Sequence, residues 1–254
     1  MSLPIRQNAP GADALIDVPR FLRERALFLD FDGTLAALQD DPETVRLPVG
    51  GADILATLHD RLAGRLTILS GRDMRDLSRR IPHTLRRIGG HGLEVCRPGE
   101  APGVMTETPP PDLAHALDRL SAGEPGTRVE PKGPILALHY RFAPERGDAL
   151  LHALRTIAAD FPAYRIQSGK LVLEVKPARA NKGVALTRQM SEPEFASFTP
   201  VMIGDDATDE DAISAATDLG GFGVKVGDGD SRAKLRLKDP AEVWAWLETL
   251  ATHR

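Results

Sequence analysis

Residues 26–34 read Ala26-Leu27-Phe28-Leu29-Asp30-Phe31-Asp32-Gly33-Thr34, a short apolar run that ends in two acids and a glycine. A short apolar run bounded by turn residues is typical of a strand that is buried on both faces. Such strands belong mainly to parallel sheets whose strands are joined by helices. This stretch therefore predicts a central strand of an α/β domain, with Asp30 and Asp32 at its carboxyl end.

Three further apolar runs predict more strands of the same sheet, at residues 66–69, 200–203 and 222–226. Helical spacing predicts a helix between the first two strands, on which the apolar residues are Ile54, Leu55, Leu58 and Leu62. Asp73 is suited to the N-cap of another helix. Strands that alternate with helices indicate an α/β fold, in which a parallel sheet has helices on both faces.

The middle of the chain has a different pattern, which predicts a separate module. After three consecutive prolines, polar and apolar residues alternate in two strand patterns, 135–141 and 164–176. Ser168-Gly169 splits the second pattern and is a hairpin signal. Helical patterns accompany these strands at 113–120 and 150–157. We therefore expect an inserted α+β cap with an antiparallel sheet, residues 105–178, within a core domain formed by residues 1–104 and 179–254.

The bulk composition is that of an ordinary folded protein, with 42% hydrophobic residues in a chain of 254. A net charge of −4 gives no overall case for a nucleic-acid partner. No apolar run approaches the roughly 20 residues that span a bilayer, so a membrane is not an expected partner either. The single cysteine, Cys96, excludes an internal disulfide and fits a reducing compartment, which predicts a cytoplasmic location. Residues 1–20 lack periodicity and are expected to be an irregular lead-in.

Asp30 and Asp32 point to the same side of an extended chain, because side chains alternate along a strand. Two carboxylates so close repel each other unless a cation or a proton lies between them. Mg²⁺ shared with a phosphate meets this need, and an aspartate can attack phosphorus to form an aspartyl-phosphate. The second aspartate could exchange a proton with the leaving alcohol and with water. The alternative is a strand-ending turn, where Asp and Gly are common; Gly33 comes too early for a calcium-binding loop.

Three other polar clusters are candidates for the same site, although each has a simpler interpretation. Ser70-Gly71-Arg72 can hold a phosphate oxygen through its hydroxyl and backbone N–H groups, or can cap a helix. Lys182 opens an amphipathic helix against the helix dipole, which favours a nearby anion unless the lysine is solvated. Residues 205–211 hold five acids, either as a solvated helix start or as a metal site that includes Asp205. Loops at the carboxyl ends of parallel strands converge, so we expect one shared site.

Together these motifs resemble the haloacid dehalogenase superfamily, and the set is specific. The matching residues are Asp30-x-Asp32-Gly33-Thr34, Ser70, Lys182 and Gly204-Asp205-Asp206-x-x-Asp209. The resemblance implies a Rossmann-like core in which Asp30 is the nucleophile and a metal ligand. It implies that Asp32 is general acid and base, with its backbone carbonyl on Mg²⁺, and that Asp205 binds Mg²⁺ directly. It also implies that Ser70 binds a phosphoryl oxygen, that Lys182 offsets negative charge, and that the metal's waters or Lys182 are held by Asp206 and Asp209.

The predicted cap carries charged side chains that share faces of its strands. The residues two or four apart in this way are Glu130 and Lys132, His139 and Arg141, and Lys170 and Glu174. Carboxylates and ammonium groups on a rigid sheet are good partners for the hydroxyls of a sugar. The alternative is a solvated sheet face that is stabilised by cross-strand ion pairs.

Longer motifs around these residues resemble trehalose-6-phosphate phosphatases, a family of that superfamily. The motifs are Gly90-His91-Gly92-Leu93-Glu94, Glu130-x-Lys132, His139-Tyr140-Arg141 and Leu173-Glu174-Val175-Lys176-Pro177. The resemblance implies that cap residues bind the distal glucose of trehalose 6-phosphate, and on matching positions these are Glu130, Lys132, Arg141, Glu174 and Lys170. It also implies that Arg72 and His91, on core loops beside the Gly71 turn, help to close the site on the substrate.

Two alternatives remain beside this expectation. A phosphatase for sucrose-phosphate or mannosyl-3-phosphoglycerate would keep the same core loops and differ in the cap. A silent binding partner of a trehalose-phosphate synthase would be expected to lose a nucleophile, a lysine or a metal ligand, yet all are present: Asp30, Asp32, Lys182 and Asp205. The resemblance therefore implies a Mg²⁺-dependent phosphoric monoester hydrolase of trehalose biosynthesis, which releases phosphate from trehalose 6-phosphate through an aspartyl-phosphate.

Overall fold

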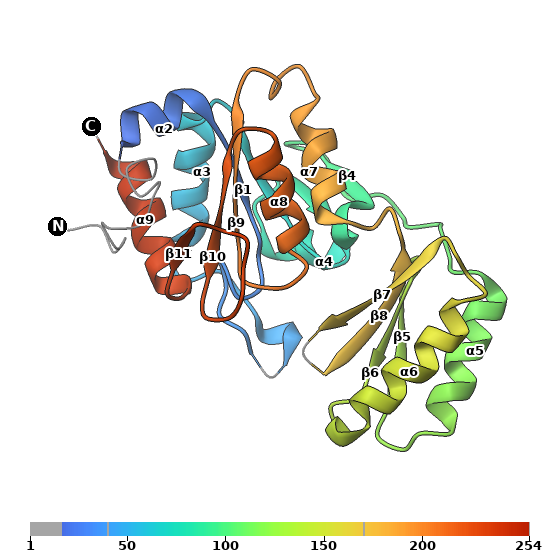
Figure 1. Cartoon of the computed structure of the whole chain (residues 1–254). Coiled ribbons are helices and arrows are strands. Elements are labelled where there is room, and N and C mark those ends of the chain that lie inside the picture. Colours follow the sequence, from blue (N-terminus) through green and yellow to red (C-terminus); the bar gives the residue numbers. More distant parts are fainter. Residues whose placement is uncertain (1–16, 40, 170, 254) are drawn as a thin grey trace. The chain divides into compact units, whose positions relative to one another are not determined.

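The computed structural model describes residues 17–39, 41–169 and 171–253. The chain divides into two compact units, each of which is described separately below (Figure 1). The first unit contains the described residues up to Pro102 together with those from Asn181 onward, and the second unit is Gly103–Ala180. The second unit is therefore an insertion, because the chain leaves the first unit and later returns to it.

The first unit is built on a seven-stranded sheet of order β11-β10-β9-β1-β2-β3-β4. The strands are β1 (Arg25–Leu29), β2 (Leu66–Leu69), β3 (Arg86–Gly89), β4 (Glu94–Cys96), β9 (Thr199–Gly204), β10 (Phe222–Val226) and β11 (Leu235–Leu237). All neighbouring pairs are parallel except β3 and β4. Strand β1 is central, since Leu27 pairs with Leu66 on one side and with Val201 on the other.

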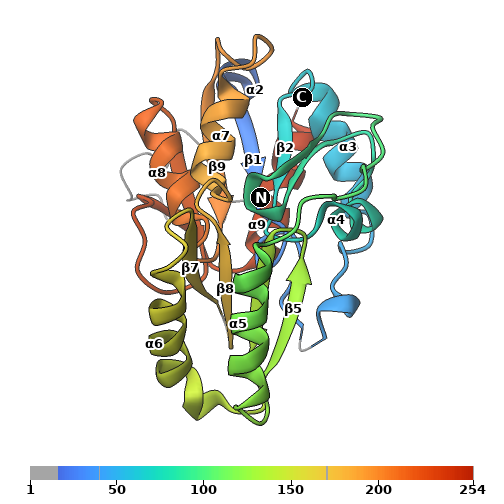
Figure 2. The same cartoon turned by 90° about the vertical axis from the view of Figure 1, so that its right-hand side faces the viewer.

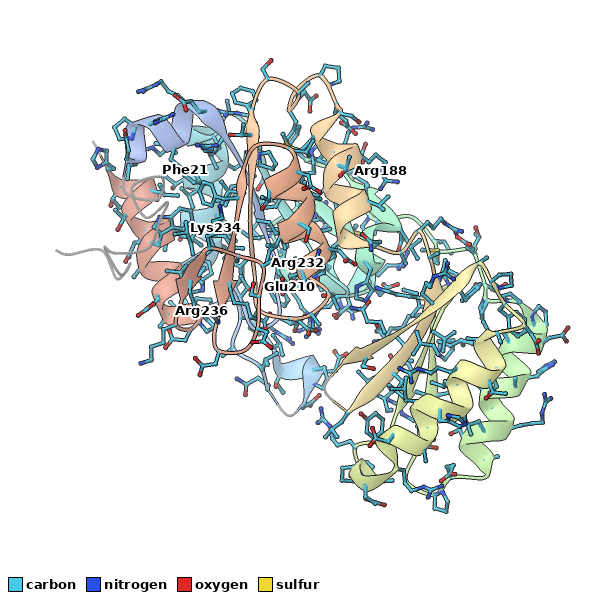
Figure 3. All side chains as sticks on the ribbon, viewed as in Figure 1. Phe21, Arg188, Glu210, Arg232, Lys234 and Arg236 are labelled. Carbon is cyan, nitrogen blue, oxygen red and sulfur yellow. The ribbon has the colours of Figure 1, made fainter. Side chains whose placement is uncertain are left out.

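Helices cover both faces of this sheet, as Figures 1 and 2 show. One face packs against α2 (Val18–Glu24), α3 (Gly51–Arg61), α4 (Met74–Arg80) and α9 (Pro240–Thr252), and the other against α7 (Lys182–Met190) and α8 (Glu210–Asp218). Alternate residues of β1 enter the two cores: Leu27 and Leu29 face the first group of helices, and Phe28 faces the second. Phe21, labelled in Figure 3, stacks edge-on against Trp246 at 5.2 Å between ring centroids. The predicted α/β fold with a parallel sheet is confirmed.

The second unit is an α+β module with its own hydrophobic core. Its antiparallel sheet has the order β5-β6-β8-β7, with strands β5 (Arg128–Lys132), β6 (Ile135–His139), β7 (Tyr164–Gly169) and β8 (Val172–Pro177). Helices α5 (Pro111–Ala122) and α6 (Gly147–Ala158) lie side by side on one face, and their leucines pack with Leu138, Leu173 and Val175. The opposite face of this sheet carries four of the charged residues that the sequence singled out, Glu130, Lys132, His139 and Glu174.

Three short 3₁₀ turns complete the described structure: η1 (Pro42–Thr44), η2 (Gly90–Gly92) and η3 (Pro144–Arg146). In the part of the chain that the structure describes, no helix has the length and the apolar character needed to cross a membrane.

Three local predictions differ from the structure. The expected irregular lead-in is wrong for its described part, because α2 begins at Val18 and Asp17 caps it by accepting the N–H of Arg20 at 3.0 Å. The hairpin signal at Ser168-Gly169 is misplaced, because both residues belong to β7 and β8 begins only at Val172. The first strand pattern, 135–141, ends earlier than expected: β6 stops at His139, so Arg141 lies in the following turn and is exposed.

Helix α7 packs closely on α8 at Gly183, the residue directly after Lys182. A Cβ built on Gly183 would lie 2.5 Å from the carbonyl oxygen of Asp211, so any side chain here pushes backbone against backbone. We predict that Gly183→Ala lowers stability by about 1–3 kcal/mol, the usual cost of overpacking. A drop in the thermal unfolding midpoint of several degrees would be measured.

The matched control is Gly103→Ala, because a Cβ on Gly103 meets no atom within 4 Å. We expect that variant to unfold within about 0.5 kcal/mol of the unmodified protein, as surface substitutions do. Equal midpoints for the two variants would contradict the close approach of α7 and α8.

Candidate active site

The predicted polar clusters follow neighbouring strands of the core sheet. In the sheet, β1 lies between β9 and β2, so the residues that follow these three strands meet at one edge. The backbone continues the ladder there: the N–H of Asp30 donates to Ile203 at 3.0 Å, and that of Ser70 donates to Ile88 at 2.9 Å. The carboxyl end of the sheet therefore brings together loops that are up to 175 positions apart, from Asp30 to Asp205.

Lys182 lies at the centre of this edge, at the first residue of α7. Its Nζ donates to Asp30 Oδ1 at 2.6 Å and to Asp209 Oδ1 at 2.7 Å. The three side chains are at most 5% exposed. Burial alone would lower the pKa of Lys182, but the two carboxylates outweigh it and raise that pKa above its ordinary value. The ammonium therefore stays charged, which explains why a lysine is tolerated at a helix start.

Asp209 supports the loop that carries the other acids. Its Oδ2 accepts the backbone N–H groups of Asp205 and Asp206, both at 3.0 Å, while its Oδ1 binds Lys182. The sequence offered two roles for Asp209, and this geometry matches the one of orienting Lys182. Asp206 is exposed, and its carboxylate accepts the N–H of Ala207 at 2.5 Å.

Three acids of the edge are close enough to hold a cation. Asp30, Asp205 and Asp209 each offer an oxygen, and these oxygens lie within 4.8 Å of one another. Burial and then the charge of Asp209 raise the pKa of Asp30 well above its ordinary range and that of Asp205 to about 7. The one positive charge of Lys182 thus does not offset three carboxylates, and a hard divalent cation with oxygen ligands fits the site.

Asp32 differs from the other acids, because its carboxylate is held by Arg72. Arg72 Nε donates to Asp32 Oδ2 and Nη2 donates to Oδ1, each at 2.7 Å. The Asp32 side chain is therefore not part of the three-acid group. The family resemblance assigned the backbone carbonyl of Asp32 to the metal, and the bonds of Arg72 to the side chain leave that carbonyl oxygen unaffected.

The turn after Asp32 is shaped to admit the Asp205 carboxylate. Gly33 has a φ of +78°, and a Cβ there would lie 2.1 Å from Asp205 Oδ2. Thr34 Oγ1 donates to Asp205 Oδ1 at 3.5 Å. The Asp-Gly-Thr sequence therefore does more than end a strand: it leaves room for an acid from a distant loop.

Ser70 is 1% exposed, and its Oγ accepts the N–H of Arg72 at 3.1 Å. The η2 turn supports this loop, because His91 donates its backbone N–H to Ser70 O at 3.1 Å. The buried His91 ring lies against Gly71, where a Cβ would be 2.5 Å from Cε1. His91 has φ +55°, an uncommon conformation for a residue with a side chain.

The expected cap residues lie on one face of the antiparallel sheet, with two exceptions. Glu130, Ala137 and Glu174 are cross-strand neighbours in one row, and Lys132 Nζ lies 3.9 Å from Glu174 Oε1. Arg141 is in the turn after β6, and Lys170 lies outside the described residues.

Two further side chains bind expected site residues: the sequence singled out His139 without giving it a role, and it missed Lys225. His139 Nε2 hydrogen-bonds Glu130 Oε2 at 2.7 Å, and this bond, as the largest cause, lowers the pKa of Glu130. Lys225, buried in β10, donates to the backbone carbonyl of Asp205. The signal for Lys225 was present, because a lysine within an otherwise apolar buried strand needs a buried acceptor.

Residues 28–241 match the model of a family described as trehalose-phosphatase. A trehalose-6-phosphate phosphatase of Escherichia coli (strain K12) is 36% identical over 246 residues, which cover 94% of this chain and 91% of that protein. The C-terminal domain of a C. albicans trehalose-6-phosphate phosphatase has the same fold, with a TM-score of 0.81 at 21% identity over 97% of this chain and 98% of that domain. A haloacid dehalogenase-like hydrolase from Bacteroides thetaiotaomicron superposes with a TM-score of 0.63 at 14% identity, covering 89% of this chain and 98% of the other. The predicted haloacid dehalogenase fold is thereby confirmed.

The uncompensated acids predict how the protein responds to a divalent cation. We expect millimolar Mg²⁺ to raise the thermal unfolding midpoint, because a cation that binds only the folded state stabilises it by roughly 2.7 kcal/mol at a hundredfold excess over its Kd. Without the cation, Asp205→Asn should be at least as stable as the unmodified protein, since it removes a carboxylate whose pKa is raised by burial and then by the charge of Asp209. When Mg²⁺ is added, the thermal unfolding midpoint of Asp205→Asn should rise little.

Asp218→Asn serves as the control, because Asp218 is an exposed acid at the end of α8. It should keep the full Mg²⁺ response. An equal response in Asp205→Asn and Asp218→Asn would mean that the three-acid group does not hold the ion.

Proposed function

Because this chain belongs to the trehalose-phosphatase family, we propose that it hydrolyses trehalose 6-phosphate to trehalose and inorganic phosphate, with Asp30 as nucleophile and Mg²⁺ as the required cation. The first unit would carry the chemistry, and the second unit, as a cap, would recognise the sugar. The other expected contacts of the substrate are kept in this proposal, including the phosphoryl oxygen at Ser70 and the loop residues Gly71 and His91.

The observation that carries the proposal is the buried ammonium of Lys182 beside Asp30. A phosphoryl group in transfer bears negative charge, and so does the aspartate that attacks it, so the reaction needs fixed positive charge. Lys182 supplies one such charge in a site shielded from water, and burial makes each electrostatic contact stronger than in solution. Asp209 binds the same ammonium, so Lys182 is held between two carboxylates.

Asp30 and Asp32 would divide the chemistry between them. A carboxylate oxygen of Asp30 bonds to phosphorus while the bond from phosphorus to the sugar oxygen breaks, and Asp32 gives its proton to that leaving oxygen. Trehalose departs as a neutral alcohol. Water then attacks phosphorus as Asp32 takes its proton, the bond to Asp30 breaks, and phosphate leaves with both aspartates restored.

Mg²⁺ would be held by Asp30, Asp205 and the backbone carbonyl of Asp32, with Asp206 and Asp209 beside it. The donor set fits, because carboxylate and carbonyl oxygens are the ligands that this ion prefers. The ion's charge would offset the excess of buried carboxylates and reduce the repulsion between Asp30 and an incoming phosphate.

Recognition of the sugar is proposed for the open face of the cap sheet. Glu130 and Glu174 flank Ala137 in one cross-strand row, so two acceptors border a position with almost no side chain. Lys132 adds a donor near Glu174, and His139 fixes the orientation of Glu130. Acceptors and donors held in this way can bind several hydroxyls of a sugar, with Arg141 and Lys170 as further candidates.

Replacing the nucleophile tests the chemistry. We predict that Asp30→Asn lowers kcat on trehalose 6-phosphate by about three orders of magnitude or more, because an amide oxygen is a very poor nucleophile. Phosphate release and the unfolding midpoint would be measured together. Asp53→Asn, an exposed acid of α3, is the control and should retain full activity. Near-normal turnover by folded Asp30→Asn would exclude the covalent route.

The same assay on the unmodified protein tests the substrate. We expect trehalose 6-phosphate to be hydrolysed with a higher kcat/KM than glucose 6-phosphate, sucrose 6-phosphate or mannosyl-3-phosphoglycerate. A faster reaction with any of these would reject the assignment of substrate while leaving the phosphatase chemistry in place.

Substitutions in the cap test sugar recognition. Glu130→Ala and Lys132→Ala should each lower kcat/KM for trehalose 6-phosphate about tenfold or more, because a hydrogen bond to a charged group contributes about 1.5–3 kcal/mol. Hydrolysis of p-nitrophenyl phosphate, which has no sugar, should change little. Asp118→Ala removes an exposed acid from α5, on the opposite side of the cap sheet, and is expected to affect neither substrate. Equal losses on both substrates would reject a role in recognition.

A further inference from the structure

A network of ion pairs, with acidic and basic side chains in alternation, extends from Asp32 into helix α4. Arg72 binds both oxygens of Asp32 and donates from Nη1 to Asp76 Oδ2 at 2.6 Å. Asp76 in turn accepts from Arg80, whose Nη2 lies 2.7 Å from Asp76 Oδ1. Arg80 is the last side chain of this network, and its Nη1 donates to the backbone carbonyl oxygen of Val45 at 2.5 Å. Three charged side chains thus connect Asp32, the proposed acid–base residue, to the segment around η1.

This ion-pair network is rigid because most of its side chains are shielded from solvent. The side chains of Arg72, Asp76 and Arg80 are 11%, 16% and 2% exposed, and that of Asp32 is 31% exposed. Burial opposes the ionisation of Asp76, but hydrogen bonds from Arg80 and Arg72 lower its pKa to about 2. The guanidinium of Arg72 also lies 5.4 Å from the Phe31 ring centroid. Arg72 therefore has fixed partners on three sides.

A two-pronged hydrogen bond fixes the plane of a carboxylate as well as its position. It takes one lone pair from each Asp32 oxygen, and an ionised carboxylate has about four. Each Asp32 oxygen therefore keeps a further lone pair, and one of these can carry the proton that Asp32 gives to the leaving oxygen and takes back from water, while Arg72 sets the orientation of the carboxyl group. Proton transfer to a leaving oxygen depends on such alignment, because the donor must lie within hydrogen-bond reach of that oxygen.

We propose that Arg72 and Asp76 are positioning residues for the proton transfers of Asp32: Arg72 orients the Asp32 carboxylate, and Asp76 orients Arg72. The proposal rests on the proposed function, because it assigns these residues to the general acid–base step. The family resemblance implies that Arg72 acts on the substrate, whereas this proposal makes Asp32 the partner of Arg72. Asp76 has no place in the motif set at all.

The test compares two aryl phosphates of similar size that differ in their need for an acid. The p-nitrophenol of p-nitrophenyl phosphate leaves readily as its anion, whereas phenol, with a pKa near that of tyrosine at about 10, needs a proton as it leaves. Because kcat/KM reports the steps up to the first irreversible one, it isolates departure of the leaving group from the later attack of water. A change in the ratio of the two kcat/KM values therefore reports on the acid itself.

We expect Arg72→Lys and Asp76→Asn to lower kcat/KM for phenyl phosphate at least about tenfold more than for p-nitrophenyl phosphate. Arg72→Lys keeps the ion pair of Asp76 and Arg80, so it stays informative if Asp76→Asn, which removes the carboxylate charge 2.7 Å from the buried Arg80, fails to fold. The control is Arg79→Ala: Arg79 also binds Asp76, at 3.0 Å, but is 68% exposed and does not touch Arg72. It should leave both values unchanged.

Equal losses on the two aryl phosphates, or no loss, in folded Arg72→Lys would overturn the proposal, because a structural role lowers both reactions alike. The same selective loss in Arg79→Ala would also overturn it. If the unmodified protein hydrolyses neither aryl phosphate nor trehalose 6-phosphate, the proposed function itself fails, and this inference fails with it.

Discussion

The salt bridges of Lys182 are the contact on which the rest of the candidate site depends. Its ammonium joins Asp30, at the end of β1, to Asp209, at the start of α8, and all three side chains are buried. Removing one partner of such a group leaves an uncompensated buried charge, which is strongly destabilising. Helix α7 contacts α8 closely at Gly183, the residue after Lys182. This contact therefore determines where the ammonium of Lys182 lies.

The sequence predicted much of this arrangement because its signals are local. The apolar runs of β1, β2, β9 and β10 stand out from their surroundings, and acids or a serine follow three of them. Parallel strands place their carboxyl ends at one edge, so the meeting of Asp30, Ser70 and Asp205 follows from topology alone. The N-cap Asp73 was equally accessible, since capping involves only residues two or three positions away.

What the sequence could not predict depends on partners that lie far apart in the chain. Nothing within a few residues of Arg72 shows that its guanidinium binds Asp32, 40 positions away. The buried carbonyl that Lys225 binds, and the positive φ of His91, likewise follow from packing between loops. In the cap, Ser168-Gly169 has the composition of a turn, yet pairing with β8 extends β7 through both residues. Tertiary contacts here override a local preference.

The way the chain enters and leaves the second unit has a consequence for evolution and engineering. Glu107, on the incoming segment, forms an ion pair with Arg179 on the outgoing one, so the two connections run close together. The unit between them has a hydrophobic core of its own. An insertion with adjacent ends and a separate core can be exchanged without threading a new path through its host. Residues 103–180 are thus a unit that can be exchanged, by evolution or in the laboratory, while the unit that holds the proposed catalytic residues is kept.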